Sequence, residues 1–273
     1  MSQVASRYRS LVIFDIDGVI RDVGGSYRRA LADTVEHFTQ GAYRPTVADI
    51  DLLKREGLWN NDWEASRELV YRYYESIDTD QTPQVKPDRE CCAIDYEQLV
   101  AFFQSRYRGP DPDHWTGYIC GEPLLLQPGY LEALTQANMG WGFFSGATRG
   151  SATYVLEKRL GLQDPLLVAM EDAPGKPDPT GLLEVVDRLD SPAPVLYAGD
   201  TVADMQTVEN ARSLQPDRQW IAVGILPPHA QNSPDYRAAY MQTLTDAGAA
   251  IVLENIEQLT PAQIKLLINS QQS

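Results

Sequence analysis

Two aspartates separated by one residue follow a short apolar segment near the start of the sequence. Residues 11–14 are four consecutive apolar side chains, and Asp15, Asp17 and Gly18 come directly after them. The run predicts a buried strand, whose carboxyl end is where an open α/β sheet builds its site. Side chains two apart in an extended chain share a face, so both carboxylates are expected to reach one substrate. The alternative is an ordinary acidic turn, because Asp and Gly are common turn residues.

Three later segments carry further groups that can do chemistry. The apolar run 141–144 ends at Ser145 and Gly146. Lys176 lies in a loop rich in turn residues, 175–179. The apolar run 195–198 leads into a glycine followed by Asp200 and, four residues later, Asp204. Each group follows or neighbours an expected strand, which favours one shared site over four unrelated turns.

These four motifs, in this order, resemble those of the haloacid dehalogenase-like hydrolase superfamily. The resemblance implies that Asp15 is the nucleophile, which attacks phosphorus and forms an aspartyl-phosphate. Asp17 is then the general acid and base: it protonates the leaving alkoxide and later activates a water molecule. Lys176 offsets negative charge beside Asp15. Catalysis of such phosphoryl transfer consists mainly of positioning and charge stabilisation.

The same resemblance implies Mg²⁺ as the cofactor. Asp15, Asp200 and the main-chain carbonyl of Asp17 are the expected ligands, because hard oxygen donors suit this ion. Asp204 is expected to bind through a water molecule or to orient Asp200. Ser145 and the main-chain N–H of Gly146 would donate hydrogen bonds to the phosphate, aided by a helix that begins near residue 148.

Further candidate substrate-binding residues lie outside the four motifs. Arg149, in the first turn of that helix, can reach substrate or lie in solvent. In the segment 58–63, two tryptophans bracket Asn60, Asn61 and Asp62, which predicts either a pocket or a turn between helices with Asp62 as the N-cap. The sequence leaves open what Arg28, Arg29 and His229 do.

The chain between the first two motifs has a helical pattern. Apolar residues recur at three- and four-residue steps over 27–38, and helical character continues over 50–58, 63–77 and 96–107. No strand is expected there. The segment resembles the α-helical cap that one subclass of the superfamily inserts after its first motif. We therefore expect a core of residues 1–22 and 118–273 and an all-α cap of residues 23–117.

The remaining chain alternates between strands and helices. Strands are expected over 141–144, 166–170, 195–198, 220–224 and 250–253, and helices over 130–137, 148–160 and 180–189. This alternation predicts a doubly wound, Rossmann-like parallel sheet with right-handed crossovers. The predicted fold class is α/β.

Composition and charge limit the classes of partner and the cellular compartment that we expect. The 273 residues carry a net charge of -15, and no basic stripe offsets it, which disfavours nucleic acid and anionic membranes. No apolar run approaches the roughly 18 residues of a membrane span. The start lacks the pattern of a signal peptide, so a cytoplasmic location is expected. The three cysteines and three histidines show no metal-ligand spacing. The oligomeric state stays open, homo-oligomers included.

The motif set favours phosphate chemistry on a small phosphorylated metabolite. Asp17 argues against the halide-displacing members, which have no alkoxide to protonate. A phosphomonoesterase is the first interpretation and a phosphosugar mutase the second. The mutases usually carry threonine where this chain has Arg21, which weakens the second interpretation. A non-catalytic phosphate-binding module is the third, and it is disfavoured because every expected catalytic group is present.

Overall fold

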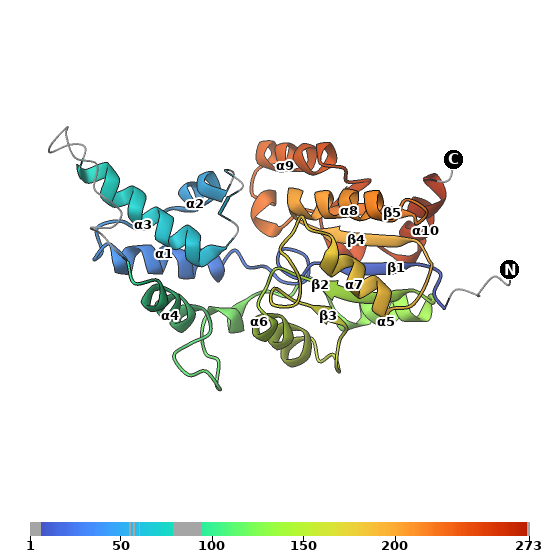
Figure 1. The fold of residues 1–273 in the computed structure, drawn as a ribbon, viewed down its shortest axis with the longest axis horizontal. Helices are drawn as coiled ribbons and strands as arrows, with labels where there is room; N and C mark the ends of the chain where they lie inside the picture. Colours follow the sequence, from blue (N-terminus) through green and yellow to red (C-terminus); the bar gives the residue numbers. More distant parts are fainter. Residues whose placement is uncertain (1–6, 55, 57, 60, 79–93, 272–273) are drawn as a thin grey trace. The chain divides into compact units, whose positions relative to one another are not determined.

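The computed structural model describes residues 7–54, 56, 58–59, 61–78 and 94–271. The chain divides into two compact units (Figure 1), one made of residues Met1–Asp22 and Pro123–Ser273 and the other of Val23–Glu122. The sequence-based division placed the second boundary between residues 117 and 118. In the structure a short 3-10 turn, Tyr118–Gly121, still belongs to the second unit.

The first unit is built on a six-stranded parallel sheet with the order β3-β2-β1-β4-β5-β6. The strands are β1 (Leu11–Phe14), β2 (Gly140–Phe144), β3 (Leu167–Val168), β4 (Val195–Gly199), β5 (Trp220–Ile225) and β6 (Ile251–Leu253). The strand order reverses at β1, which pairs with both β2 and β4. Open α/β sheets bind ligands at the carboxyl ends of strands beside such a reversal. The predicted doubly wound fold is confirmed.

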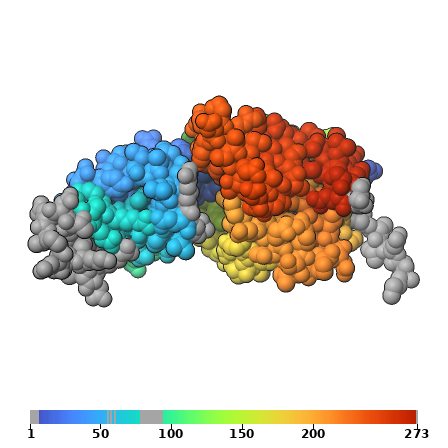
Figure 2. Space-filling view, turned by 90° about the horizontal axis from the view of Figure 1, so that it is seen from above, coloured from blue at the N-terminus to red at the C-terminus, as the bar shows by residue number. Residues whose placement is uncertain are grey.

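Helices cover both faces of this sheet because its strands are apolar on both sides. Val12 and Phe14 of β1 face one core, to which the helices α5 (Pro128–Gln136), α6 (Arg149–Thr153) and α10 (Pro261–Ser270) contribute. Leu11 and Ile13 face the other core, under α7 (Thr180–Arg188), α8 (Val202–Leu214) and α9 (Pro234–Asp246). In the space-filling view, the orange to red C-terminal segments make up much of the visible surface of the first unit (Figure 2).

Two expected elements differ in detail from the structure. The strand expected over 166–170 is only Leu167–Val168, because the N–H of Ala169 donates to Asp172 Oδ2 and that of Met170 to the carbonyl of Ala147. The helix expected over 148–160 is α6 followed by a π-helical turn, Tyr154–Arg159.

The last three helices have no bounds predicted from the sequence, although their starts carry readable signals. The side chains of Thr201, Ser233 and Thr260 each accept a hydrogen bond from the N–H three residues later. Pro234 and Pro261 then occupy the first helical position of α9 and α10. A hydroxyl residue followed by proline is a common helix start.

The second unit contains α1 (Tyr27–Phe38), α2 (Val47–Lys54), α3 (Asp62–Asp78) and α4 (Tyr96–Tyr107), and its described residues include no strand. Aromatic stacking joins α1 to α4: the ring centroids of Tyr27 and Tyr107 are 4.2 Å apart, and those of His37 and Phe102 are 4.0 Å apart. Among the described residues of the whole chain, no helix is both long and apolar enough to cross a lipid bilayer.

Candidate active site

Three carboxylates gather at the carboxyl ends of β1 and β4. Asp15 follows β1, Asp200 follows β4, and Asp204 lies in the first turn of α8. The two strands pair directly, with Phe14 opposite Ala198. One carboxylate oxygen of each of the three aspartates lies within 4.8 Å of the others. The reversal of strand order therefore brings together residues that are far apart in the sequence.

Lys176 bridges two of these carboxylates. Its Nζ lies 2.9 Å from Asp15 Oδ1 and 2.6 Å from Asp204 Oδ1, and its side chain is 10% exposed. The loop that carries it is fixed by a hydrogen bond of 2.9 Å from Asn210 Nδ2 to the carbonyl of Pro177. A buried charge needs such partners, so the loop delivers one ammonium group to two aspartates.

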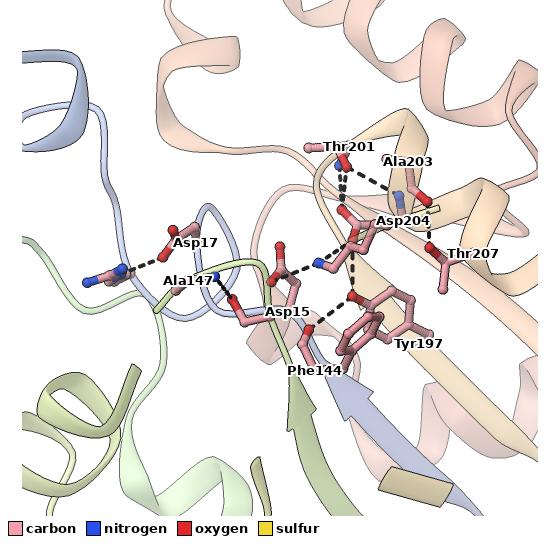
Figure 3. A network of polar contacts seen from close by, with 12 residues as sticks. Asp15, Asp17, Phe144, Ala147, Tyr197, Thr201, Ala203, Asp204 and Thr207 are labelled. Atoms are coloured by element: carbon pink, nitrogen blue, oxygen red, sulfur yellow. Dashed lines mark hydrogen bonds and ion pairs between the residues drawn. The ribbon is translucent and has the colours of Figure 1, made fainter. Parts of the chain in front are cut away.

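Asp204 is completely buried and accepts several hydrogen bonds (Figure 3). Its Oδ2 accepts from the N–H and the hydroxyl of Thr201, at 2.9 and 2.6 Å, while Thr201 Oγ1 accepts from the N–H of Asp204. This reciprocal pair is a capping box at the start of α8. The hydroxyl of Tyr197 lies 3.0 Å from Oδ1. Both oxygens are thus engaged by protein groups, which suits Asp204 to holding Lys176 and the helix start.

Burial and mutual repulsion shift the acidity of this cluster. Burial raises the pKa of Asp15 to about 6, against the opposing effect of Lys176, and the Asp204 and Asp17 charges raise it further. Burial, then the charges of Asp204 and Asp15, hold the pKa of Asp200 well above its usual value. Burial alone would raise the pKa of Asp204. Lys176 and the hydrogen bonds from Thr201 outweigh burial, so the pKa of Asp204 lies below its usual value.

The donor set fits a divalent cation such as Mg²⁺. Three carboxylates gather around one ammonium group, so negative charge is in excess in the cluster. Gly18 makes the close approach of Asp200 feasible. It has φ +76°, and a Cβ at this position would lie 2.1 Å from Asp200 Oδ2. The turn after Asp15 therefore lacks a side chain where the second carboxylate enters, and the oxygens that converge there are hard ligands.

Asp17 has an orientation that the sequence analysis did not predict. Its Oδ1 accepts a hydrogen bond of 2.6 Å from Arg21 Nε. In Figure 3 its side chain points away from the carboxylate of Asp15. Asp15 and Asp17 lie beyond the extended strand, because β1 ends at Phe14. The carbonyl of Ile16 instead accepts N–H bonds from Val19, Ile20 and Arg21, which forms a turn.

Ser145 and Gly146 follow β2, which pairs with β1 on the side opposite β4. Ser145 is buried, and its Oγ accepts a hydrogen bond of 3.2 Å from the N–H of Ala147. This leaves its hydroxyl proton to be donated to a bound oxygen. A Cβ added at Gly146 would meet no atom within 4 Å, so the space beside this residue is open.

The arginine at the start of α6 is engaged with acidic side chains. The N–H of Arg149 donates to Glu171 Oε2 at 2.8 Å, and its guanidinium group forms an ion pair with Asp172. The amino end of this helix thus already faces two carboxylates. An incoming phosphate would have to compete with them for Arg149.

The candidate pocket residues of the helical unit have structural partners within that unit. Asn61 Oδ1 accepts the N–H of Trp63 at 2.9 Å and so caps α3, a role that the turn alternative gave to Asp62. Asp62 instead forms an ion pair of 2.5 Å with Lys54. Asn60 lies outside the described residues, as do Cys91 and Cys92.

The other residues whose roles the sequence left open also have neighbours. Arg28 pairs with Asp51, and the Arg29 guanidinium lies 4.1 Å from the centre of the Tyr118 ring. His229 packs edge-on against Tyr240, at 6.1 Å between ring centroids.

Sequence reasoning missed three residues that support the site. Tyr197 lies in a buried strand, where a phenol usually needs a hydrogen-bond partner. Thr201 and Asp204 have the spacing of a capping box, which is a readable signal. Tyr240 donates to the main-chain carbonyl of Asp200 at 2.9 Å, and nothing in the sequence marks this contact.

Comparisons with known proteins find relatives in sequence and in fold. An imidazoleglycerol-phosphate dehydratase from Phytophthora nicotianae is 29% identical over 260 residues, which span 92% of this chain and 51% of the relative. The chain thus spans about half the length of this curated relative. The solved structure of phosphatase Tt82 from Thermococcus thioreducens has a TM-score of 0.64 at 24% identity, over 78% of this chain and 92% of that one. A phosphonoacetaldehyde hydrolase-like protein from Oleispira antarctica has a TM-score of 0.64 at 18% identity, over 98% and 96%.

The family comparison covers most of the chain. The sequence model of the haloacid dehalogenase-like hydrolases matches residues 10–212, a stretch that begins just before β1 and ends within α8. It therefore includes every motif from Asp15 to Asp204. With the fold shared by the solved structures and the carboxylate cluster at the strand reversal, the match shows that this chain belongs to the haloacid dehalogenase-like hydrolases.

Proposed function

We propose that this chain is a Mg²⁺-dependent phosphomonoesterase that acts on a small phosphorylated metabolite through an aspartyl-phosphate on Asp15. One observation carries the proposal. Asp15 stands at the carboxyl end of β1, 2.9 Å from a buried ammonium group, and shares its site with Asp200. A carboxylate kept next to a cation in a buried site is suited to attack an anionic phosphate.

The reaction follows from the positions of the side chains. A carboxylate oxygen of Asp15 attacks phosphorus, and the bond from phosphorus to the ester oxygen breaks. Lys176 offsets the charge that Asp15 and the phosphoryl group bring together. Ser145 and the N–H of Gly146 hold the phosphoryl oxygens from the adjacent β2. Water then attacks the same phosphorus and releases inorganic phosphate and a free Asp15.

Asp17 handles the proton in both halves of this reaction. It gives a proton to the ester oxygen as that oxygen leaves, and it takes one from the attacking water afterwards. Its pairing with Arg21 means that its side chain must turn before either transfer.

Asp15, Asp200 and the main-chain carbonyl of Asp17 are the groups that would hold Mg²⁺. When bound, the cation neutralises the excess negative charge of the carboxylates and the phosphate. Asp204 keeps Lys176 in place beside Asp15.

The substrate class is proposed from the chemistry of the site and from one relative. The site fits a phosphate monoester, and the dehydratase relative is named for a phosphorylated imidazole compound. A panel of phosphorylated metabolites should therefore include imidazoleglycerol-phosphate and sugar phosphates.

The test measures inorganic phosphate released from this panel and from p-nitrophenyl phosphate, with and without a chelator. We expect release that the chelator abolishes and added Mg²⁺ restores. Conversion of a sugar phosphate to its isomer without phosphate release would replace this function with a mutase. Full turnover in verified metal-free protein would contradict the proposed cofactor.

A further inference from the structure

Arg21 is a completely buried arginine directly beside the proposed acid and base. Its exposure is 0%, and its Nε lies 2.6 Å from Asp17 Oδ1, whose side chain is 29% exposed. Removing a guanidinium group from water is costly unless carboxylates or other acceptors compensate. The ion pair therefore contributes to keeping the Asp17 side chain where it is.

Main-chain hydrogen bonds fix the position of Arg21 in the turn. The N–H of Arg21 donates to the carbonyl of Ile16 at 3.1 Å, and its own carbonyl accepts from the N–H of Gly18 at 2.9 Å. Bridges join Arg21 to both Asp17 and Leu124. Only Asp17 is partly in solvent, so Asp17 is the partner that can turn.

In this orientation Asp17 is not placed to exchange a proton with a substrate that is held at Asp15. Asp17 points toward the guanidinium group and away from the carboxylate that would attack phosphorus (Figure 3). To act as the acid, Asp17 must come within hydrogen-bond reach of the leaving oxygen. That oxygen is bonded to the phosphorus atom that Asp15 attacks.

We propose that Arg21 is a positioning residue that holds the ionised Asp17 in a resting orientation. The ion pair opens before the reaction, and Asp17 then takes from solvent the proton that it gives to the leaving oxygen. After Asp17 has taken a proton from the attacking water, it returns that proton to solvent as the ion pair re-forms. The inference rests on the proposed function, because it assigns the pair a place in that reaction. Arg21 itself touches neither substrate nor phosphoryl group in this account. Its effect reaches the reaction only through Asp17.

The first test compares two esters in the phosphorylation step under single-turnover conditions. An alkyl phosphate needs its leaving oxygen protonated, whereas p-nitrophenyl phosphate scarcely does. In Arg21→Met, the alkyl rate relative to the aryl rate should rise about ten-fold, which is the scale of one charge-assisted hydrogen bond. In an Asp17→Asn background, the same substitution should leave the ratio unchanged.

Controls separate positioning from general damage. Arg218→Met removes a different arginine of the same unit, a partly buried one that donates to the main-chain carbonyl of Ser191, and should not change the ratio. Arg21→Lys keeps the charge without the Nε donor and should shift the ratio less than Arg21→Met. A ratio that falls in Arg21→Met, or that changes equally in the Asp17→Asn background, overturns the proposal.

A second measurement does not depend on turnover or on Arg21→Met being folded. The Nε–H resonance of Arg21 in wild-type protein should exchange slowly with solvent and should move in Asp17→Asn. A fast-exchanging resonance that ignores Asp17 would overturn the holding role even if the enzyme is active. Absence of phosphatase activity beside an intact resonance would instead overturn the proposed function and the catalytic part of this inference, while leaving the ion pair established.

Discussion

The ammonium nitrogen of Lys176 lies 2.6 Å from Oδ1 of Asp204, and Asp204 is entirely buried. The same nitrogen lies 2.9 Å from Asp15. Asp204 therefore affects the proposed nucleophile indirectly, because it holds the cation that stands beside Asp15.

Asp204→Asn should damage both stability and activity. The change weakens an ion pair in a buried site and disturbs the capping box of α8, so the free energy of unfolding should fall by about 3 kcal/mol. Urea unfolding monitored by circular dichroism measures this loss. The matched control is Tyr197→Phe, which removes the hydroxyl group that contacts the same carboxylate. This change should lower the free energy of unfolding by about 1 kcal/mol. Equal losses in the two variants would contradict the anchoring role.

Gly18→Ala should weaken the binding of Mg²⁺. A methyl group at this position would lie 2.1 Å from Asp200 Oδ2, so the carboxylate must move. Gly161→Ala is the control, because Gly161 has a similar φ of +74° and open space around it. Both variants pay the backbone strain of a left-handed residue. Only Gly18→Ala should lower the affinity for Mg²⁺ in isothermal titration, by about ten-fold or more, the effect of losing roughly 1.4 kcal/mol. Unchanged affinity would mean that Asp200 is not a ligand.

The raised pKa of Asp15 gives the metal-free protein a specific pH dependence. Its folded value of about 6 exceeds the unfolded value of about 4, so the folded state holds more protons between these two pH values. The contribution of Asp15 to stability is therefore present below pH 4 and is lost as pH rises through 6. Its slope is at most about 1.4 kcal/mol per pH unit.

Binding of Mg²⁺ should change with pH in the opposite direction, because a protonated Asp15 is a poor ligand. We expect the stabilisation by Mg²⁺, measured as the rise in Tm, to increase from pH 5 to pH 7. Asp15→Asn should remove the Asp15 part of both dependences. A wild-type protein with the same Mg²⁺ effect at both pH values would refute this coupling.

The two aspartates of the first motif should respond differently to substitution. Asp15→Asn should abolish turnover of every ester, because an amide cannot form the proposed aspartyl-phosphate. Asp17→Asn should slow the phosphorylation step for alkyl esters more than for p-nitrophenyl phosphate. Single-turnover kinetics are needed, since steady-state rates can report hydrolysis of the intermediate. The same loss for both esters would rule out Asp17 as the acid.

The fold and the main site residues could be predicted because parallel strands present their carboxyl ends at one edge. Asp15, Ser145 and Asp200 follow β1, β2 and β4, three strands that are adjacent in the parallel sheet, so all three residues lie at the same edge. The orientation of Asp17 could not be predicted. It depends on where β1 ends and on the turn that closes on Ile16, and a strand pattern does not fix the point at which the strand stops.

Tertiary contacts account for the other differences. Tyr240 reaches Asp200 from α9, a helix for which the sequence analysis made no prediction. The polar residues Asn61 and Asp62 were consistent both with a pocket and with a helix start, because amide and carboxylate groups serve both purposes. The sequence does not reveal the partners that they have in the structure, the N–H of Trp63 and the ammonium of Lys54.

The stereochemical course at phosphorus tests the central claim most directly. A thiophosphate ester made chiral with oxygen isotopes is hydrolysed by wild-type protein, and the configuration of the released thiophosphate is determined by NMR. Transfer first to Asp15 and then to water comprises two in-line displacements, each of which inverts the phosphorus centre. The account predicts overall retention of configuration. Overall inversion would show that water attacks the ester directly, and it would contradict the role of Asp15 as nucleophile.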